Sequence, residues 1–358
     1  MKLRNLNRIQ IPTWRWLGMN EAALETDMPL GTPYRGGALS GAGSVELRHD
    51  FAPAEIPNLP ADLGRLRDFV QEHQNYSLHL TIPEDVQCEQ PIILDFLLDE
   101  ASSVLVDNIE VHALAGSRAD VVLRYRSAGK GARFHGGFAS LRAERGAQVC
   151  LIKIQMLDEE DIHLDGTAIT VEAGGEGSAL CCELGGGQVV SGCNVLLAGK
   201  ESRGGLDTLY LGSEGRTQDF NYRLELRGPA SQGEIVSRGA LSGSAKKTLK
   251  STLDFIRGAS GAKGREEETV LALSDRVVNL STPLLLCGED NVEGAHATSS
   301  GKPDPAKLYY LMSRGFTQRE AKRLLVEASF TSIINKLPTP DLRDAVRQKI
   351  REVVHGEH

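Results

Sequence analysis

The sequence has few aromatic residues and few cysteines. Phe, Trp and Tyr make up 5% of its 358 residues, whereas glycine occurs 38 times. This combination predicts tight turns and packing of small residues rather than a large aromatic core. The six cysteines form no CxxC pair and no disulfide framework. We therefore expect reduced thiols and a cytoplasmic protein.

Long apolar runs are absent as well. The N-terminal sequence MKLRNLNRIQIPTWRW lacks the apolar core and cleavage site of a signal peptide. No stretch approaches the roughly 20 apolar residues of a membrane helix. The net charge is −8, which argues against nucleic acid as a partner because phosphate binding requires clustered Lys and Arg. We expect neither a membrane nor a nucleic-acid partner.

Motifs of common enzyme classes are missing. The sequence contains no nucleophile elbow, no HExxH and no paired-carboxylate motif. The glycine-rich segment GASGAKGR (258–265) does not match the phosphate-binding loop GxxxxGK[ST]. We expect a non-enzymatic protein without an ATP site in this chain.

The sequence does contain a long series of short strands. From about residue 75 to 300, apolar or alternating runs such as SVLVDNIEVHAL and AQVCLIKIQML are separated by glycine-rich turns about every 25–30 residues. Such turns, with no helices between them, predict stacked coils of strand, that is, a mainly β protein with a β-helix core. A β-sandwich is the alternative. The predicted divisions are 1–74 (irregular, with a helix over 61–74), 75–300 (β-helix) and 301–358 (helical).

The C-terminal segment predicts three helices. Asp304 and Thr317 are expected N-caps, with Pro305 at the first helical position and Glu320 completing a capping box. We expect the second helix to bury an apolar stripe made of Ala321, Leu324, Leu325, Ala328 and Ile333 or Ile334. The third helix begins at Thr339-Pro340, and its expected buried stripe is Leu342, Val346, Ile350 and Val353. Residues 304–358 carry ten Lys and Arg against seven Asp and Glu, a net charge of +3. We expect this segment to cap an open end of the solenoid and to offer a partner surface.

The segment DNVEGAHATSSGKPDPAKLYYLMSRGFTQREAKRLLVEASF resembles the C-terminal signature of the SufB/SufD family, the scaffold proteins of SUF iron–sulfur cluster assembly. The matching elements are a histidine in a small-residue run, a glycine five residues later, LYYLMSRG and EAKRLL. PTWRWLGMN (Pro12–Asn20) is similar to a stretch near the start of SufD-type members. The resemblance also includes RGALSGSAKKTLKSTLDF and VVNLSTPLLLCGEDNV, so it is good over roughly residues 230–355 and loose before them.

The resemblance implies a right-handed parallel β-helix core with a C-terminal helical subdomain. It also implies a complex in which a SufD-like chain pairs with a SufB-like scaffold through the β-helix and docks a SufC-type ABC ATPase through the C-terminal helices. The cargo would be a transient iron–sulfur cluster at a subunit interface. Flavin use is left open by the resemblance.

His296 is the cluster-assembly residue that the resemblance identifies. The SufB pattern has a glutamate directly after this histidine, whereas Ala297 follows here, and the place of the essential SufB cysteine falls near Val277. The chain is therefore similar to SufD. Imidazole is a ready iron ligand, so His296 is a candidate metal ligand, with Cys287 a weaker one. The alternative is that His296 forms an ordinary interface hydrogen bond.

Seven residues are expected to contact the ATPase partner, because a run of consecutive bulky side chains exceeds the single stripe that one helix buries. They are Lys307, Leu308, Tyr309, Tyr310, Leu311, Met312 and Arg314.

The other cysteines and histidines are expected to be structural. On a strand, Cys181 and Cys182 point to opposite faces, so they do not share a metal, and free cysteine is usually a small buried hydrophobe. We expect the same of Cys193, and structural or exposed roles for His79, His112, His135 and His163. Two alternative functions stay open, a homodimeric SufB-like scaffold and a β-helix enzyme acting on polysaccharides.

Overall fold

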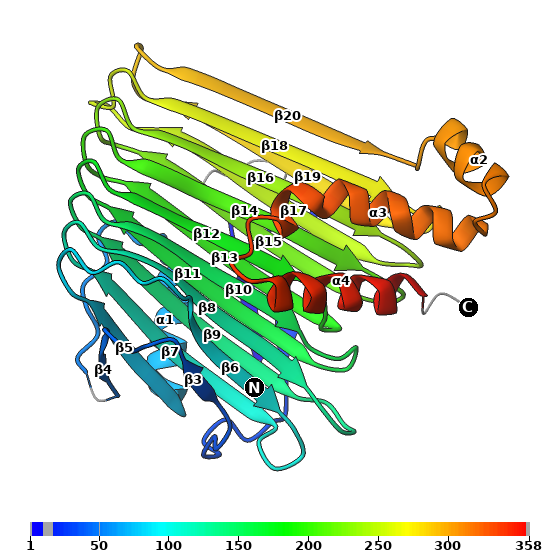
Figure 1. Ribbon diagram of the computed structural model, residues 1–358, viewed down its shortest axis with the longest axis horizontal. Coiled ribbons are helices and arrows are strands. Elements are labelled where there is room, and N and C mark those ends of the chain that lie inside the picture. Colours follow the sequence, from blue (N-terminus) through cyan, green and yellow to red (C-terminus); the bar gives the residue numbers. More distant parts are fainter. Residues whose placement is uncertain (1, 10–16, 50, 356–358) are drawn as a thin grey trace.

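The computed structural model describes residues 2–9, 17–49 and 51–355. The chain forms a β-solenoid of about eight turns over residues 76–301, followed by helices (Figure 1). This confirms the predicted mainly β fold with a β-helix core. No helix in the described ranges is long and apolar enough to cross a membrane.

Successive strands alternate between two nine-stranded sheets, which we call the even sheet and the odd sheet after the numbers of most of their strands. The even sheet contains β3 (Ala38–Ser40), β6 (Ile92–Leu98), β8 (Arg118–Ser127), β10 (Gln148–Met156), β12 (Glu176–Glu183), β14 (Arg203–Gly212), β16 (Gln232–Leu241), β18 (Lys263–Ala272) and β20 (Glu293–Gly301). The odd sheet contains β4 (Glu46–Arg48), β5 (Tyr76–Ile82), β7 (Val104–Ala113), β9 (Phe134–Ala143), β11 (Ile162–Val171), β13 (Gln188–Leu197), β15 (Thr217–Leu226), β17 (Lys246–Phe255) and β19 (Val278–Cys287).

Each coil places one strand in each sheet, and the strands from β5 to β20 pair in parallel. The length of a coil can be read from residues paired between adjacent coils. Asp95 and Arg124 are paired in register and hydrogen-bonded, and they are 29 residues apart. The coil that leads from Lys246 to its partner Val278 is slightly longer. The turns therefore recur close to the predicted spacing, and the small variation in coil length is absorbed in the loops.

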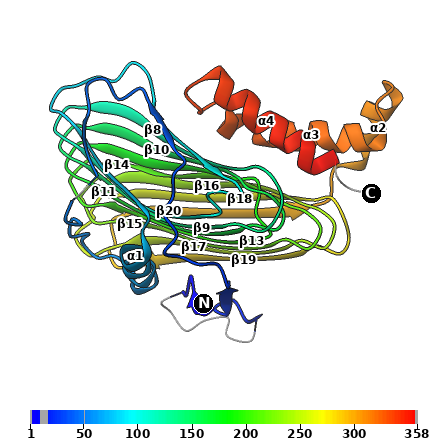
Figure 2. The same cartoon turned by 90° about the horizontal axis from the view of Figure 1, so that it is seen from below.

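Three apolar clusters hold the solenoid together. The largest fills the space between the sheets, where the ring of Phe96 stacks on Tyr125 at a centroid distance of 5.4 Å. The second lies between the outer face of the even sheet and the C-terminal helices, and includes Leu209 and Phe330. The third lies between the outer face of the odd sheet and helix α1 (Ala61–His73), where Leu66 is buried. Figure 2 shows α1 and the C-terminal helices on opposite sides of the solenoid.

The N-terminal segment differs from the irregular chain that we expected. It contains β1 (Lys2–Leu6) and β2 (Ala22–Glu25), which form an antiparallel pair, and β3 and β4 pair antiparallel with the first coil. The backbone carbonyl of Met19 accepts a hydrogen bond from Lys250 Nζ at 3.0 Å, so this segment crosses the outer face of the odd sheet. Residues 12–16 of the PTWRWLGMN motif lie outside the described residues.

The C-terminal helices α2 (Pro305–Ser313), α3 (Gln318–Ile334) and α4 (Pro340–His355) have the predicted starts. Asp304 accepts a hydrogen bond from the Ala306 amide, and Thr317 and Glu320 form the predicted capping box. These local signals suffice because a cap involves only neighbouring residues.

The expected position of these helices was wrong. Helix α3 packs across β14 and β16 on the face of the even sheet, and Figure 1 shows α3 and α4 in front of this sheet, with β20 uncovered at its edge. The buried stripe of α3 is as predicted at its two ends, where Ala321, Ile333 and Ile334 are buried. Its middle differs, because Val326 and Phe330 are buried whereas Ala328 is exposed. The open end of the solenoid therefore stays uncapped by the helices, because the apolar outer face of β14 and β16 binds them instead.

Candidate functional site

The last coil ends in β20, and His296 lies on this strand. All nine residues of β20 are exposed. Gly294, two residues before His296, faces the interior of the solenoid, because a Cβ there would contact Phe255 and Leu285, both on the odd sheet. Side chains two residues apart share a face, so His296 also faces the interior of the solenoid. It is nevertheless exposed, since no further coil covers it.

The strand beneath His296 carries two glutamates on the same interior face, both buried. Glu268 Oε1 lies 2.6 Å from Lys247 Nζ and accepts a hydrogen bond from Tyr210 at 2.8 Å. Tyr210 on β14 reaches Glu268 on β18 across the intervening strand β16. It can do so because its neighbour on β16 is Gly239, where a Cβ would overlap the Tyr210 ring. Burial raises the pKa of Glu266 to about 7, although the Ser251 hydroxyl opposes the shift. Of these two glutamates, only Glu268 has a cationic partner among the described residues.

Cys287 ends β19 and is exposed. It pairs with Phe255 in the sheet, whereas His296 pairs with Glu266 in the other sheet. Within the described ranges, no three His, Cys, Asp or Glu side chains come close enough to hold a metal ion. The described residues at this end therefore include no complete ligand set for a metal ion.

Helix α2 directly follows β20, and its surface is largely exposed. The relative exposure of Tyr309 is 76%, that of Tyr310 is 57% and that of Met312 is 46%. Arg314 lies over the Tyr310 ring at 5.2 Å. Leu311 lines a shallow apolar hollow together with Tyr310 and a residue of α3. The bulky run of α2 thus lies on the surface, at the C-terminal end of the strand that carries His296 (Figure 1).

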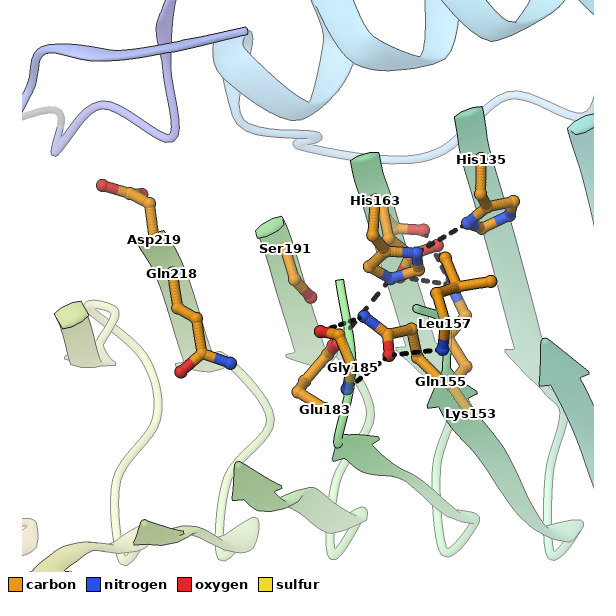
Figure 3. A network of polar contacts seen from close by, with 12 residues as sticks. His135, Lys153, Gln155, Leu157, His163, Glu183, Gly185, Ser191, Gln218 and Asp219 are labelled. Carbon is orange, nitrogen blue, oxygen red and sulfur yellow. Dashed lines mark hydrogen bonds and ion pairs between the residues drawn. The ribbon is translucent and has the colours of Figure 1, made fainter. Parts of the chain in front are cut away.

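A second polar cluster lies deep inside the solenoid (Figure 3). His135 Nε2 lies 2.5 Å from Asp107 Oδ1, and His135 Nδ1 lies 2.7 Å from His163 Nδ1. Lys153 Nζ is 2.8 Å from both carboxylate oxygens of Asp165. All five side chains are buried. Burial opposes the charge of Lys153, but the Asp165 carboxylate outweighs it and raises its pKa.

The contacts in this cluster link two imidazoles to one carboxylate. His135 Nε2 donates to the Asp107 carboxylate, and the Nδ1 of one imidazole donates to the Nδ1 of the other. Burial lowers the pKa of His163 well below its ordinary value and raises that of Glu183 to about 8. The 3.7 Å contact between His163 Nε2 and Glu183 Oε2 thus joins two neutral groups at pH 7 and is not an ion pair.

The prediction for the paired cysteines is confirmed. Cys181 faces the interior cluster and Cys182 faces the cluster under the C-terminal helices, and both are buried. Cys193 is also in the interior cluster, and burial raises the pKa of its thiol to about 12. Such a thiol is protonated at neutral pH and is a poor metal ligand or nucleophile.

The sequence analysis missed the interior histidine cluster. His135 and His163 are 28 residues apart, which is one coil, and they pair in register on adjacent strands. Asp107 is also 28 residues before His135, but on β7 it pairs with Gly137, two residues further along the sheet. This spacing was visible in the sequence, but it carries meaning only when the strand register is known. The histidines His79 and His112, by contrast, lie near the surface beside Glu110 and Glu144.

Comparisons with known proteins agree with this architecture. Residues 96–329 match the family model described as the SufBD core domain of SUF system FeS cluster assembly. The iron–sulfur cluster assembly protein SufD of Bacillus subtilis (strain 168) is 35% identical over 152 residues, which is 42% of this chain and 35% of that protein. An iron–sulfur cluster assembly SufBD family protein of Mycobacterium leprae is 24% identical over 273 residues, which is 74% of this chain and 69% of that protein.

A SufBD family protein of Staphylococcus epidermidis is 26% identical over 145 residues, covering 40% of this chain and 31% of that protein. The chain thus spans about a third of the length of the B. subtilis and S. epidermidis relatives in these matches. The family match covers most of the β-helix and part of the helical segment. The chain belongs to the SufBD family of SUF iron–sulfur cluster assembly proteins.

Proposed function

We propose that this chain is the SufD-type scaffold subunit of a SUF assembly complex and has no catalytic activity of its own. Its last coil pairs with a SufB-like scaffold, and helix α2 docks a SufC-type ABC ATPase. A transient iron–sulfur cluster is the cargo at the interface between the two scaffolds. The complex works in the cytoplasm, where thiols such as Cys193 stay reduced.

The open edge of β20 supports pairing with another β-helix. An edge strand exposes backbone N–H and C=O groups, and proteins usually protect such an edge with proline, lysine or a covering element. Residues 293–301 contain neither proline nor lysine, and all nine are exposed. An uncovered edge of this kind is suited to accept the strand of a partner.

The surface of α2 supports docking of the ATPase. Tyr309, Tyr310 and Met312 form an exposed group of large apolar side chains on one short helix, and exposed aromatic residues are enriched in protein interfaces. Lys307 and Arg314 supply positive charge beside them. The expected contact residues Leu308 and Leu311 lie on the same helix and extend its apolar surface.

One observation carries the proposal, namely that the exposed His296 strand leads directly into the exposed helix α2. The two proposed contacts are therefore joined by a short stretch of chain, residues 302–304. Movement of a partner on α2 can be transmitted to the strand that carries His296. A single chain offers too few ligands for a cluster in its described ranges, which favours a cluster shared with a second subunit.

Co-expression with a SufB-like and a SufC-type protein, followed by affinity purification, tests the partners. We expect all three chains to copurify, and the double variant Tyr309→Ala, Tyr310→Ala to lose the ATPase while it keeps the scaffold partner. Gln348→Ala, exposed on α4, is the control. Point variants are preferable to deletion of residues 304–358, since deletion would uncover the apolar face of the even sheet.

The proposal is wrong if no ATPase copurifies with the unmodified chain. If this chain binds the ATPase but associates with itself instead of the SufB-like protein, the homodimeric scaffold is the correct function. The role of His296 is tested separately. His296→Ala should lower the iron and sulfide content of the complex and leave its thermal unfolding unchanged, because an exposed side chain adds little to stability.

A further inference from the structure

Two glutamates on β18 have the same surroundings in the strand but different partners. Glu266 and Glu268 both point into the solenoid and are 3% and 1% exposed. The carboxylate of Glu268 is neutralised by Lys247 and also bonded by Tyr210. Glu266 interacts with the Ser251 hydroxyl and has no such cation among the described residues. In the part of the chain that the structure describes, its Oε2 has no hydrogen-bond partner, and neither has Oε2 of Glu268.

The nearby cations are engaged elsewhere. Lys247 is used by Glu268. Lys263 and Arg265 alternate with Gly264 and Glu266 along β18, so they face the outer side of the sheet, where Lys263 pairs with Glu293 at 2.8 Å. A buried carboxylate without a cation is costly, so this position calls for a proton or for a bound cation.

His296 is the residue next to Glu266 across the sheet. The two are paired in register on β18 and β20, so their backbones are about 4.8 Å apart and their side chains leave the sheet on the same side. Glu266 is covered by β20, whereas His296 has no strand above it. An imidazole and a carboxylate therefore stand side by side at the open end of the solenoid, where a second protein can reach them.

We propose that Glu266 and His296 are two adjacent ligands of a ferrous iron site at the open end of the solenoid, with the remaining ligands supplied by the partner scaffold. Imidazole nitrogen together with carboxylate oxygen suits divalent iron. The inference rests on the proposed function, because it assigns the chemistry of the interface that contains His296. It adds a residue that lies one coil before the histidine, on the neighbouring strand of the same sheet.

The test uses the complex of this chain with its scaffold and ATPase partners. Fe²⁺ alone is added without oxygen, and bound iron is measured by equilibrium dialysis. We expect Glu266→Gln and His296→Ala each to weaken Fe²⁺ binding by roughly 10–100-fold, the range seen when support of a metal site is removed. Glu293→Gln, on β20 but on the outer side of the sheet, should bind Fe²⁺ like the unmodified complex.

Subunit composition and thermal unfolding are measured on the same samples. Gln keeps the size of Glu266 and removes its charge, so the variant should fold and assemble normally. If Glu266→Gln binds Fe²⁺ like the unmodified complex while His296→Ala does not, the role of Glu266 is overturned and the proposed function stands. If neither variant changes Fe²⁺ binding, the iron site is overturned. A failure of the unmodified chains to assemble overturns the proposed function and this site with it.

Discussion

The buried carboxyl of Glu183 makes the stability of the chain depend on pH. Burial raises its pKa from 4.5 to about 8, with a further contribution from the nearby Asp165 carboxylate. The folded state thus holds a proton that the unfolded state releases above pH 4.5. Stability contributed by this group is fully present below pH 4.5 and is lost as the pH rises to about 8.

The size of this effect follows from the shift. Each pKa unit corresponds to about 1.36 kcal/mol, so the folded chain loses about 4 kcal/mol from this group between pH 5 and pH 8. Glu183→Gln has no proton to lose and keeps an amide that can bond Ser191. We expect the variant to match the unmodified chain at pH 5 and to be more stable by about 4 kcal/mol at pH 8, which is a rise of roughly 5 °C in Tm for a chain of 358 residues.

Thermal unfolding of both proteins at pH 5 and pH 8 measures the effect. Glu176 is exposed on the same strand, so Glu176→Gln is the control. The change in Tm that this substitution causes should be the same at pH 5 and pH 8. The reasoning would be refuted by a Glu183→Gln variant whose change in Tm is the same at pH 5 and pH 8, because the carboxyl would then be ionised to the same extent in both states.

Two further predictions concern buried groups. Lys247→Met leaves the Glu268 carboxylate buried without its cation and should destabilise the chain by about 3–5 kcal/mol. Lys246 is exposed on the same strand, so the control Lys246→Met should change the free energy of unfolding by less than about 0.5 kcal/mol. Urea unfolding measures both variants, and equal losses would contradict the role of the ion pair. Cys287 is exposed and should react with a thiol reagent in the native protein. Burial raises the pKa of the Cys193 thiol to about 12, so Cys193 should react only after unfolding. Mass spectrometry of the labelled peptides identifies the order of labelling, and early labelling of Cys193 would show that the interior opens.

Much of the fold was predictable because its signals are local or periodic. The turns repeat at the length of a coil, and the caps at Asp304 and Thr317 depend on residues within one turn of helix. The face of α3 was not predictable. Leu325 and Phe330 both belong to helical stripes, and the choice between them is made by the sheet on one side and α2 on the other.

The candidate site shows the same division. His296 was recognisable from a resemblance that extends into the following helix, but its neighbour Glu266 was not, because a whole coil of sequence separates the two. The exact length of each coil decides which side chains stack, and the coil from Lys246 to Val278 is longer than the one that joins Asp95 to Arg124. A turn can gain or lose one residue without disturbing the strands. The spacing in the sequence alone therefore does not identify which side chains lie side by side in the sheet.

The uncovered last coil has a consequence for how such a protein can be altered. His296 faces inward, as do the buried residues of every earlier coil, and it is accessible only because the stacking stops at β20. Adding one more coil after Gly301 would convert this histidine into a core residue without changing any atom of it. The exposure of His296 is thus set by the number of coils, and duplication of a single coil would bury it.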